Sequence, residues 1–297
     1  MAGIVGSADK IGQCLAQIII DSRRHWQYVG SDEMKYTGVG VTCVDDLWYT
    51  CIMDGTGTVE CMPVILTEKP ADIDFYRCGY SAVPYIGELY ACYALSFTGG
   101  ATPKWFRDNF AELEHSKAQK EGKNVYAELD SMVSDRPTGI LVLPHFAGAT
   151  TPYMDNAAKA AFVGVTLETT KYHLYQALIE GTSYEMLLNF NKMSVLTGKI
   201  DEIRASGGGA ASDIRLQIKA EILNSEITAL AAKEVGAAGT AALAGTAVGV
   251  YKNFKDAAAK MASVRKVFSP NPENTKKYNE LYQKYEKLYD AVKELSL

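Results

Sequence analysis

The sequence lacks the motifs of a P-loop, a zinc site, a membrane-spanning helix and a secretory signal. It has no Gly-x-x-x-x-Gly-Lys-Ser/Thr segment, so a P-loop mechanism is unsupported. None of its 6 cysteines forms a Cys-x-x-Cys pair, so buried free thiols are favoured over a disulfide framework. Its 4 histidines lack metal-ligand spacing, so we expect no zinc site. No apolar run reaches membrane-spanning length, and no secretory pattern opens the chain.

Charge and composition exclude further classes of protein. The net charge of −5 provides no general attraction to nucleic acid or to an anionic membrane surface. Hydrophobic residues at 47% and charged residues at 22% are ordinary for a globular domain. No Pro/Gly/Ser-rich linker and no internal repeat divides the 297 residues. We therefore expect one compact domain over residues 1–297, in the cytoplasm, with no membrane or nucleic-acid partner.

The apolar pattern predicts an α/β domain with a mixed sheet flanked by helices. Runs rich in β-branched and aromatic residues indicate strands, and apolar residues at helical spacing indicate helices. Strands are expected at 3–5, 36–44, 47–53, 59–66, 75–80, 140–144, 160–167, 203–205 and 226–230. Helices are expected at 11–20, from about 85 to 105, at 125–133, after 169–170, and at 210–223, 238–251, 254–264 and 274–297.

A glycine triplet, Gly207–Gly209, is the most informative stretch that is present. It joins a strand-like run to a helix-like segment that begins near Ala210. Glycines let a backbone approach a ligand without a clashing Cβ, and a helix start offers unpaired N–H groups to an anion. A flexible turn is the alternative for the triplet alone. A Rossmann-type dehydrogenase is disfavoured, because the Gly-x-Gly-x-x-Gly spacing is missing.

Small-residue turns recur along the chain, at Gly38-Val-Gly40, Gly99-Gly100 and Gly236-Ala-Ala-Gly239. Together with the triplet, several such turns on one sheet edge would form a nucleotide cleft. Four independent turns are an equally good interpretation of the pattern alone.

Two aspartates adjoin small residues and each has two interpretations. Asp9 follows Gly6-Ser-Ala and opens a helical segment, where a carboxylate can cap the helix or project as a general base. Spacing alone favours the cap. The segment 54–58, Asp-Gly-Thr-Gly-Thr, is superficially similar to the Asp-x-Gly-Thr phosphate loop of actin-like ATPases. It lies between two expected strands, so a hairpin turn is favoured.

Tyrosines at three- and four-residue spacing mark the last helical segment. These are Tyr278, Tyr282, Tyr285 and Tyr289. The spacing predicts a helix that packs on its own domain or on a partner, which leaves a homodimer open.

Four segments carry a resemblance when they are taken in order. Residues 140–155 are a strand followed by Gly-x-x-x-Pro-Tyr-x-Asp, and 162–185 contain a second characteristic run. Residues 206–212 form the glycine loop, and 234–245 form a helix of small residues. The set resembles the C-terminal domain of the FGGY family of carbohydrate kinases, which includes glycerol kinase and xylulokinase.

The resemblance implies a ribonuclease H-like, actin-like ATPase fold. Family members have two such domains with the active site between them, so the chain would be the nucleotide-binding lobe, and the N-terminal sugar-binding lobe would be a separate partner or a missing part. The implied function is transfer of the γ-phosphoryl group of ATP, with Mg²⁺, to a sugar or polyol hydroxyl. The alternative is a non-catalytic actin-like nucleotide-binding or regulatory module.

The resemblance also assigns roles to individual residues. It makes Asp9 the general base, in place of the cap, and makes Lys10 its neighbour at the substrate, where known members have Gln or Asn. Gly38 falls in a phosphate turn in which Val39 replaces a hydroxyl-bearing residue. Positions at the nucleotide are Gly100, Lys104 (Gln in glycerol kinase), Gly208, Gly209 and Ser212 (Asn in glycerol kinase). The departures at Lys10 and Val39 favour the non-catalytic alternative.

Overall fold

The computed structural model describes residues 3–4, 37–44, 47–54, 59–85, 89–197, 203–232 and 235–295, and its side chains from residue 59 onward. The chain forms two compact units. The first comprises Met1–Thr56 and Leu230–Arg265, and the second comprises Gly57–Ala229 and Lys266–Leu297. That the two units act as a single domain stays a prediction.

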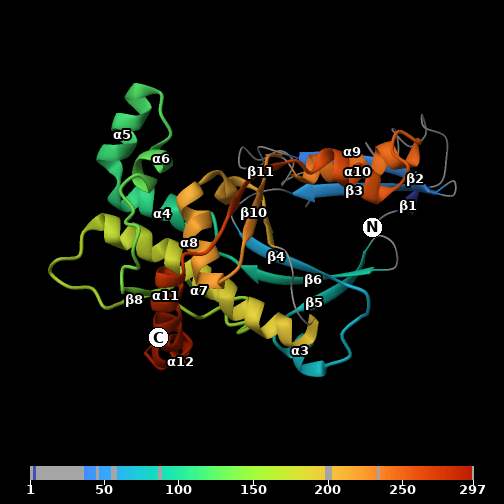
Figure 1. The fold of residues 1–297 in the computed structure, drawn as a ribbon. Helices are drawn as coiled ribbons and strands as arrows, with labels where there is room; N and C mark the ends of the chain where they lie inside the picture. Colours follow the sequence, from blue (N-terminus) through green and yellow to red (C-terminus); the bar gives the residue numbers. More distant parts are fainter. Residues whose placement is uncertain are drawn as a thin grey trace. The chain divides into compact units, whose positions relative to one another are not determined.

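The described part of the first unit combines an antiparallel sheet with helices α9 and α10. Strands β1 (Gly3–Ile4), β2 (Thr37–Val44) and β3 (Leu47–Asp54) lie in the order β1-β3-β2. Strands β2 and β3 pair antiparallel along their whole length, from Thr37 with Asp54 to Val44 with Leu47. Helix α9 (Val235–Ala247) packs against β2, and α10 (Phe254–Met261) packs against α9 (Figure 1).

The second unit begins with a three-stranded antiparallel sheet. Strands β4 (Glu60–Leu66), β5 (Ser81–Tyr85) and β6 (Leu89–Ser96) lie in the order β4-β6-β5. Pro63 and Pro84 lie in the two outer strands of this sheet. An edge strand tolerates proline because its missing N–H can face away from the neighbouring strand. Two expectations were wrong here, the strand at 75–80 and the helix from 85 to 96.

Each error has a physical reason. Helix α3 (Ile73–Arg77) replaces the expected strand because the Asp72 carboxylate caps it, accepting from Asp74 N at 2.8 Å. Strand β6 lies between two other strands, and its residues are partly or fully buried on both faces. It therefore shows no polar alternation, and its apolar run is hard to distinguish from a helix.

A long helix forms the centre of the second unit. Helix α7 (Lys171–Thr197) starts where predicted, and Thr170 Oγ1 accepts from His173 N at 3.3 Å. It packs beside β7 (Leu141–Leu143), which pairs with β8 (Ala161–Val163). Gly181 allows this contact, because a Cβ there would lie 2.5 Å from Val142 O. Helices α4 (Ala101–Phe110), α5 (Glu112–Glu121) and α6 (Val125–Asp130) precede β7 (Figure 1).

A second, parallel element follows the long helix. Strand β9 (Ile203–Ala205) leads through the 3₁₀ turn η1 (Gly208–Ala211) into α8 (Asp213–Leu223), and β10 (Ile227–Leu230) returns parallel to β9. Strand β11 (Val264–Phe268) adds to β10. The sequence did not predict β11, because its first four residues are exposed and carry Arg265 and Lys266.

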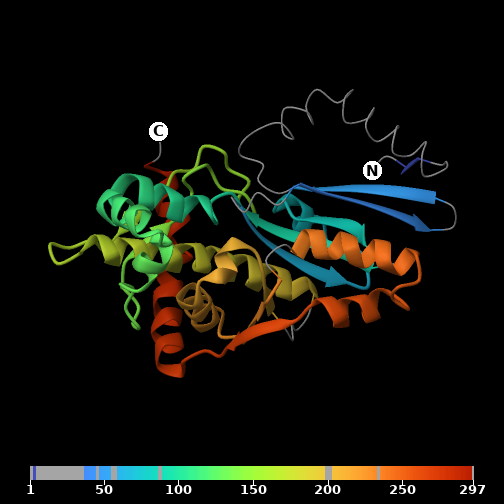
Figure 2. The same ribbon diagram turned by 90° about the horizontal axis from the view of Figure 1, so that it is seen from above.

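The chain closes with α11 (Pro272–Tyr285) and α12 (Leu288–Lys293). Asn271 caps α11, and Pro272 is its first residue. Helix α11 crosses α7 in both views (Figure 2). Cys61, Cys78 and Cys92 are free thiols, as expected, but only Cys92 is buried, and the expected burial was wrong for the exposed Cys61. Within the described ranges, no helix combines the length and the apolar character needed to cross a membrane.

Candidate functional site

The first glycine turn of the second unit lies between β6 and α4. Gly99 is buried against Glu60, and a Cβ on Gly99 would lie 2.6 Å from Glu60 Cβ and 2.7 Å from Glu60 N. Gly100 is exposed and is the N-cap of α4, which has no side-chain cap and no acidic residue in its first turn. The N–H groups at the start of α4 are therefore well placed to bind an anion.

Lys104 adds a cation to the first turn of the same helix. Its side chain is exposed and has no hydrogen bond or ion pair within the part of the chain that the structure describes. A flexible ammonium beside a helix N-terminus increases the attraction for a phosphate group. Gly100 and Lys104, both predicted from the sequence, thus lie on one short segment.

Buried hydroxyl groups hold this turn in place. Thr98 Oγ1 donates to Pro144 O, and Thr102 Oγ1 donates to Thr98 O. Both threonines are 2% exposed. The turn is therefore attached to the segment after β7, and its backbone is fixed before any ligand arrives. Sequence reasoning missed these residues, although threonines four apart around Gly99-Gly100 are a visible signal.

The glycine triplet forms the start of α8. Gly207 has φ +84°, a conformation that favours glycine. Gly208 and Gly209 have no such conformation, and a Cβ on either would meet nothing within 4 Å. Neither backbone conformation nor packing thus requires glycine at these two exposed positions. Close approach of a ligand would require it.

Ser212 completes the triplet turn by capping α8. Its Oγ accepts from Arg215 N at 3.3 Å. The hydroxyl is then oriented at the start of the helix, and its own proton is still available to a ligand. Ser212 therefore has a structural role as the N-cap of α8 that does not depend on a ligand.

Glu60 contacts the Gly99-Gly100 turn and also helix α8, which follows the glycine triplet. Its carboxylate forms an ion pair with Lys219 Nζ on α8, and its backbone lies against Gly99. The structure thus brings the Gly99-Gly100 turn and the helix of the triplet to the same residue. No local pattern predicts this contact, because Glu60 and Lys219 are 159 residues apart.

Two sequence interpretations were wrong in their local geometry. Gly38 is not in a turn but inside strand β2, where it pairs with Met53, because the hairpin ladder continues through it. Gly236 and Gly239 lie inside helix α9, as the resemblance implies, and not in a turn. The hairpin turn proposed for 54–58 falls on residues of which the structure describes only Asp54, so it stays a prediction.

The two residues predicted to act on the substrate, Asp9 and Lys10, lie outside the described residues. Within the described part of the chain, no group of three or more His, Cys, Asp or Glu side chains could hold a metal ion.

The segment 140–155 anchors the C-terminal helices. Tyr153 stacks on Tyr289 with ring centroids 3.8 Å apart, and Tyr289 OH donates to Asp155 Oδ2 at 2.7 Å. Tyr285 OH donates to the buried Glu185 carboxylate at 2.5 Å. The tyrosines of the last helical segment therefore pack within their own unit, one of the two arrangements that the sequence predicts. The homodimer stays a prediction.

Glu180 holds α7, α11 and the segment before β7 together. Its carboxylate accepts from Thr138 N at 3.1 Å, from Gln176 Nε2 at 3.0 Å and from Tyr278 OH at 3.2 Å. Burial raises the pKa of Glu180 to about 7, and these hydrogen bonds limit the rise. The sequence resemblance includes Glu180 but does not reveal this role.

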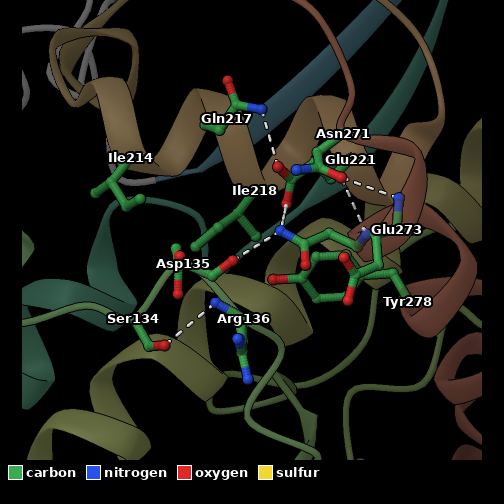
Figure 3. Close-up of a pocket in the computed structure, with 11 residues that line it drawn as sticks. Ser134, Asp135, Arg136, Ile214, Gln217, Ile218, Glu221, Asn271, Glu273 and Tyr278 are labelled. Atoms are coloured by element: carbon green, nitrogen blue, oxygen red, sulfur yellow. Dashed lines mark hydrogen bonds between the residues drawn. The ribbon is translucent and has the colours of Figure 1, made fainter.

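A polar pocket of about 230 Å³ opens between α8 and the start of α11 (Figure 3). Glu221 in its wall accepts from Gln217 and from Asn274, which also donates to Asp135 O. None of the predicted site residues lines this pocket. Its polar walls already bind one another, so it does not by itself indicate a ligand.

Comparisons with known proteins agree with the resemblance. Residues 55–248 match the model of the FGGY family of carbohydrate kinases, C-terminal domain. The chain is 29% identical over 270 residues to xylulose kinase of Staphylococcus epidermidis, covering 91% of this chain and 52% of that protein. It is 34% identical over 183 residues to glycerol kinase 1 of Clostridium tetani, covering 61% and 35%.

Solved structures give the same result for the fold. Xylulose kinase from Lactobacillus acidophilus, in a ligand-bound crystal structure, matches with a TM-score of 0.68 and 22% identity, covering 87% of this chain and 48% of that one. Plasmodium falciparum glycerol kinase with ADP matches with a TM-score of 0.63 and 20% identity, covering 78% and 46%. The ribonuclease H-like, actin-like ATPase fold is confirmed. The chain spans about half the length of these relatives.

Proposed function

Because the chain belongs to the FGGY family of carbohydrate kinases and matches its C-terminal domain, we propose that it is the nucleotide-binding lobe of a cytoplasmic ATP-dependent sugar or polyol kinase. Its partner is the N-terminal, sugar-binding lobe that makes up the other half of the longer relatives. The two lobes together transfer the γ-phosphoryl group of ATP to a hydroxyl of the substrate.

One observation carries the proposal most directly. Gly208 and Gly209 are glycines that the fold does not need, at the start of a helix in the segment that resembles the family's adenine-side loop. The absence of side chains leaves room for the flat adenine ring against the backbone. Glu60 contacts both the Gly99-Gly100 turn and Lys219 on α8, the helix that follows the triplet, which supports assigning the two segments to one site.

The described residues supply binding and orientation. The N–H groups at the start of α4 and the Lys104 ammonium bind phosphate oxygens of ATP, and the triplet holds the adenosine end. Holding the nucleotide in a fixed turn lowers the entropic cost of reaching the reactive arrangement. Gly38, inside β2, contributes at most its backbone to this site.

Asp9 and Lys10 complete the proposed mechanism. Asp9 accepts the proton of the attacking hydroxyl, and Lys10 contacts the substrate. Loss of a positioned general base costs on the order of 10²–10⁴ in rate. Mg²⁺, when bound to the ATP phosphates, neutralises charge on the phosphoryl oxygens.

Titration calorimetry of the chain with ADP tests the nucleotide role. The wild-type chain is expected to bind ADP weakly, and Gly209→Val is expected to abolish binding while it keeps its melting temperature, because the new side chain enters open space. Absence of binding by the wild-type chain at millimolar ADP would refute the proposal. Equal binding by Gly209→Val would remove the triplet from the site.

A non-catalytic actin-like module is the second candidate, favoured by Lys10 and Val39 where active relatives have other residues. Mixing the chain with an N-terminal lobe of the family and assaying phosphoryl transfer to pentuloses, hexuloses and polyols separates the two. Turnover that is lost in Asp9→Asn supports the kinase. ADP binding without turnover on any acceptor supports the module.

A further inference from the structure

Glu60 occupies an unusual place between the two segments assigned to the nucleotide. It is the first residue of β4, where it pairs with Ser96 of β6. Its backbone is against Gly99, close enough that no side chain could be inserted there. Its carboxylate binds Lys219 in the second turn of α8.

The Glu60–Lys219 ion pair is less exposed to water than the Lys266–Asp213 ion pair on the same helix. The side chains of Glu60 and Lys219 are 22% and 23% exposed. Lys266 and Asp213, which pair at the start of α8, are 52% and 49% exposed. An ion pair that is largely shielded from water has a stronger attraction between its charges, and salt weakens that attraction less. An exposed ion pair contributes little to stability.

The Gly99-Gly100 turn is supported from two sides. Thr98 and Thr102 fix it to the segment after β7, and Glu60 blocks its movement toward β4. Helix α8 continues directly from the triplet through Ser212. A constraint on Lys219 therefore also constrains the position of Gly208 and Gly209 relative to the first turn.

We propose that the Glu60–Lys219 ion pair is a positioning device that sets the separation of the Gly99-Gly100 turn and the glycine triplet, and thereby the affinity for nucleotide. The proposal rests on the nucleotide-binding function proposed above. Neither residue needs to touch the nucleotide. The pair acts by pre-organising both segments, so that binding has less conformational freedom to remove.

Hydrogen–deuterium exchange of the ligand-free chain tests the positioning directly. In Lys219→Met, amides in 97–104 and 206–213 are expected to exchange about three- to tenfold faster, and the dissociation constant for ADP is expected to rise by a similar factor. Glu60→Gln, which is nearly isosteric, is expected to act in the same direction. Lys219→Arg, which keeps the charge, is expected to retain most of both properties.

A matched control and a double variant sharpen the test. Lys117→Met breaks an ion pair of the same chemistry with Glu128, on α5 and α6, and is expected to leave ADP affinity and the exchange of both segments unchanged. Glu60→Gln combined with Lys219→Met is expected to be no worse than Lys219→Met alone, because both remove one interaction.

Two results would overturn the positioning role. Unchanged exchange in both segments for Lys219→Met and Glu60→Gln would exclude it, whatever happens to ADP affinity. A loss of ADP affinity with unchanged exchange would make Lys219 a direct ligand instead. If the wild-type chain binds no ADP, the proposed function fails, and the exchange measurement still decides the positioning. If Lys219→Met does not fold, Glu60→Gln carries the test.

Discussion

Glu180 is expected to make the stability of the second unit depend on pH. It is fully buried on α7, and every described partner of its carboxylate is a hydrogen-bond donor. Its pKa is raised from the ordinary value of 4.5 to about 7, because burial disfavours the charged form. When the pKa of a carboxyl group is higher in the folded state than in the unfolded state, its contribution to stability is fully present below the pKa of the unfolded state. That contribution is lost as the pH rises through the pKa of the folded state.

The size of the effect follows from the two pKa values. Between pH 5 and pH 8 the contribution of Glu180 to the free energy of unfolding is expected to fall by about 2 to 3 kcal/mol. Glu180→Gln removes the titration but adds its own penalty, since an amide NH₂ faces donors such as Thr138 Oγ1. That penalty is independent of pH, so it shifts the whole curve and does not change its slope.

Urea unfolding of the wild-type chain and of Glu180→Gln at pH 5 and at pH 8 measures this difference. The free energy that the substitution costs is expected to be smaller at pH 8 by about 2 to 3 kcal/mol. Other titrating groups, among them Glu114 with its lowered pKa, are common to both proteins and cancel. An equal cost at the two pH values would show that Glu180 does not titrate in this range, and the reasoning would be wrong.

Three further substitutions test individual contacts. Gly181→Ala places a Cβ against Val142 O and is expected to destabilise the chain by about 1–3 kcal/mol in urea unfolding; a neutral result would mean that β7 moves freely away from α7. Ser212→Ala removes the cap of α8 and is expected to cost about 1 kcal/mol, with faster amide exchange in the first turn of α8 if the cap matters. Tyr285→Phe removes the donor to Glu185 Oε2, while His145 Nε2 stays 3.3 Å from Oε1, and is expected to lower the free energy of unfolding by about 1.5–3 kcal/mol; an unchanged midpoint would show that another donor replaces the tyrosine.

Local sequence signals predicted much of the secondary structure. The hairpin of β2 and β3, the strand β7 and the start of α7 at Thr170 follow from apolar pattern and capping residues. The failures occur where neighbours in space decide the outcome. Residues 89–96 form strand β6 because they pair with β4 on one side and β5 on the other. Residues 264–268 form strand β11 because their backbone pairs with β10, although most of their side chains are exposed.

The residues of the candidate site also fall into those that local sequence predicts and those that depend on distant partners. Gly100, Lys104, Gly208, Gly209 and Ser212 carry their signal in a few neighbouring residues, and the structure places all five at helix starts. Glu60 and Glu180 carry little local signal. Lys219, the partner of Glu60, is 159 residues away, and of the donors to Glu180 only Gln176 is near it in the sequence. Long-range positioning of this kind depends on topology, which a single sequence specifies only through the complete fold.

The tyrosines of the last two helices have a consequence for how the chain is synthesised. Tyr278 and Tyr285 donate to Glu180 and Glu185, and Tyr289 donates to Asp155, over separations of 98, 100 and 134 residues. On a ribosome, these carboxylates emerge long before their donors. Thr138, Gln176 and His145 precede Glu180 and Glu185 in the chain, so part of each hydrogen-bond network can form early. We expect the networks to be completed only after the C-terminal helices have been synthesised.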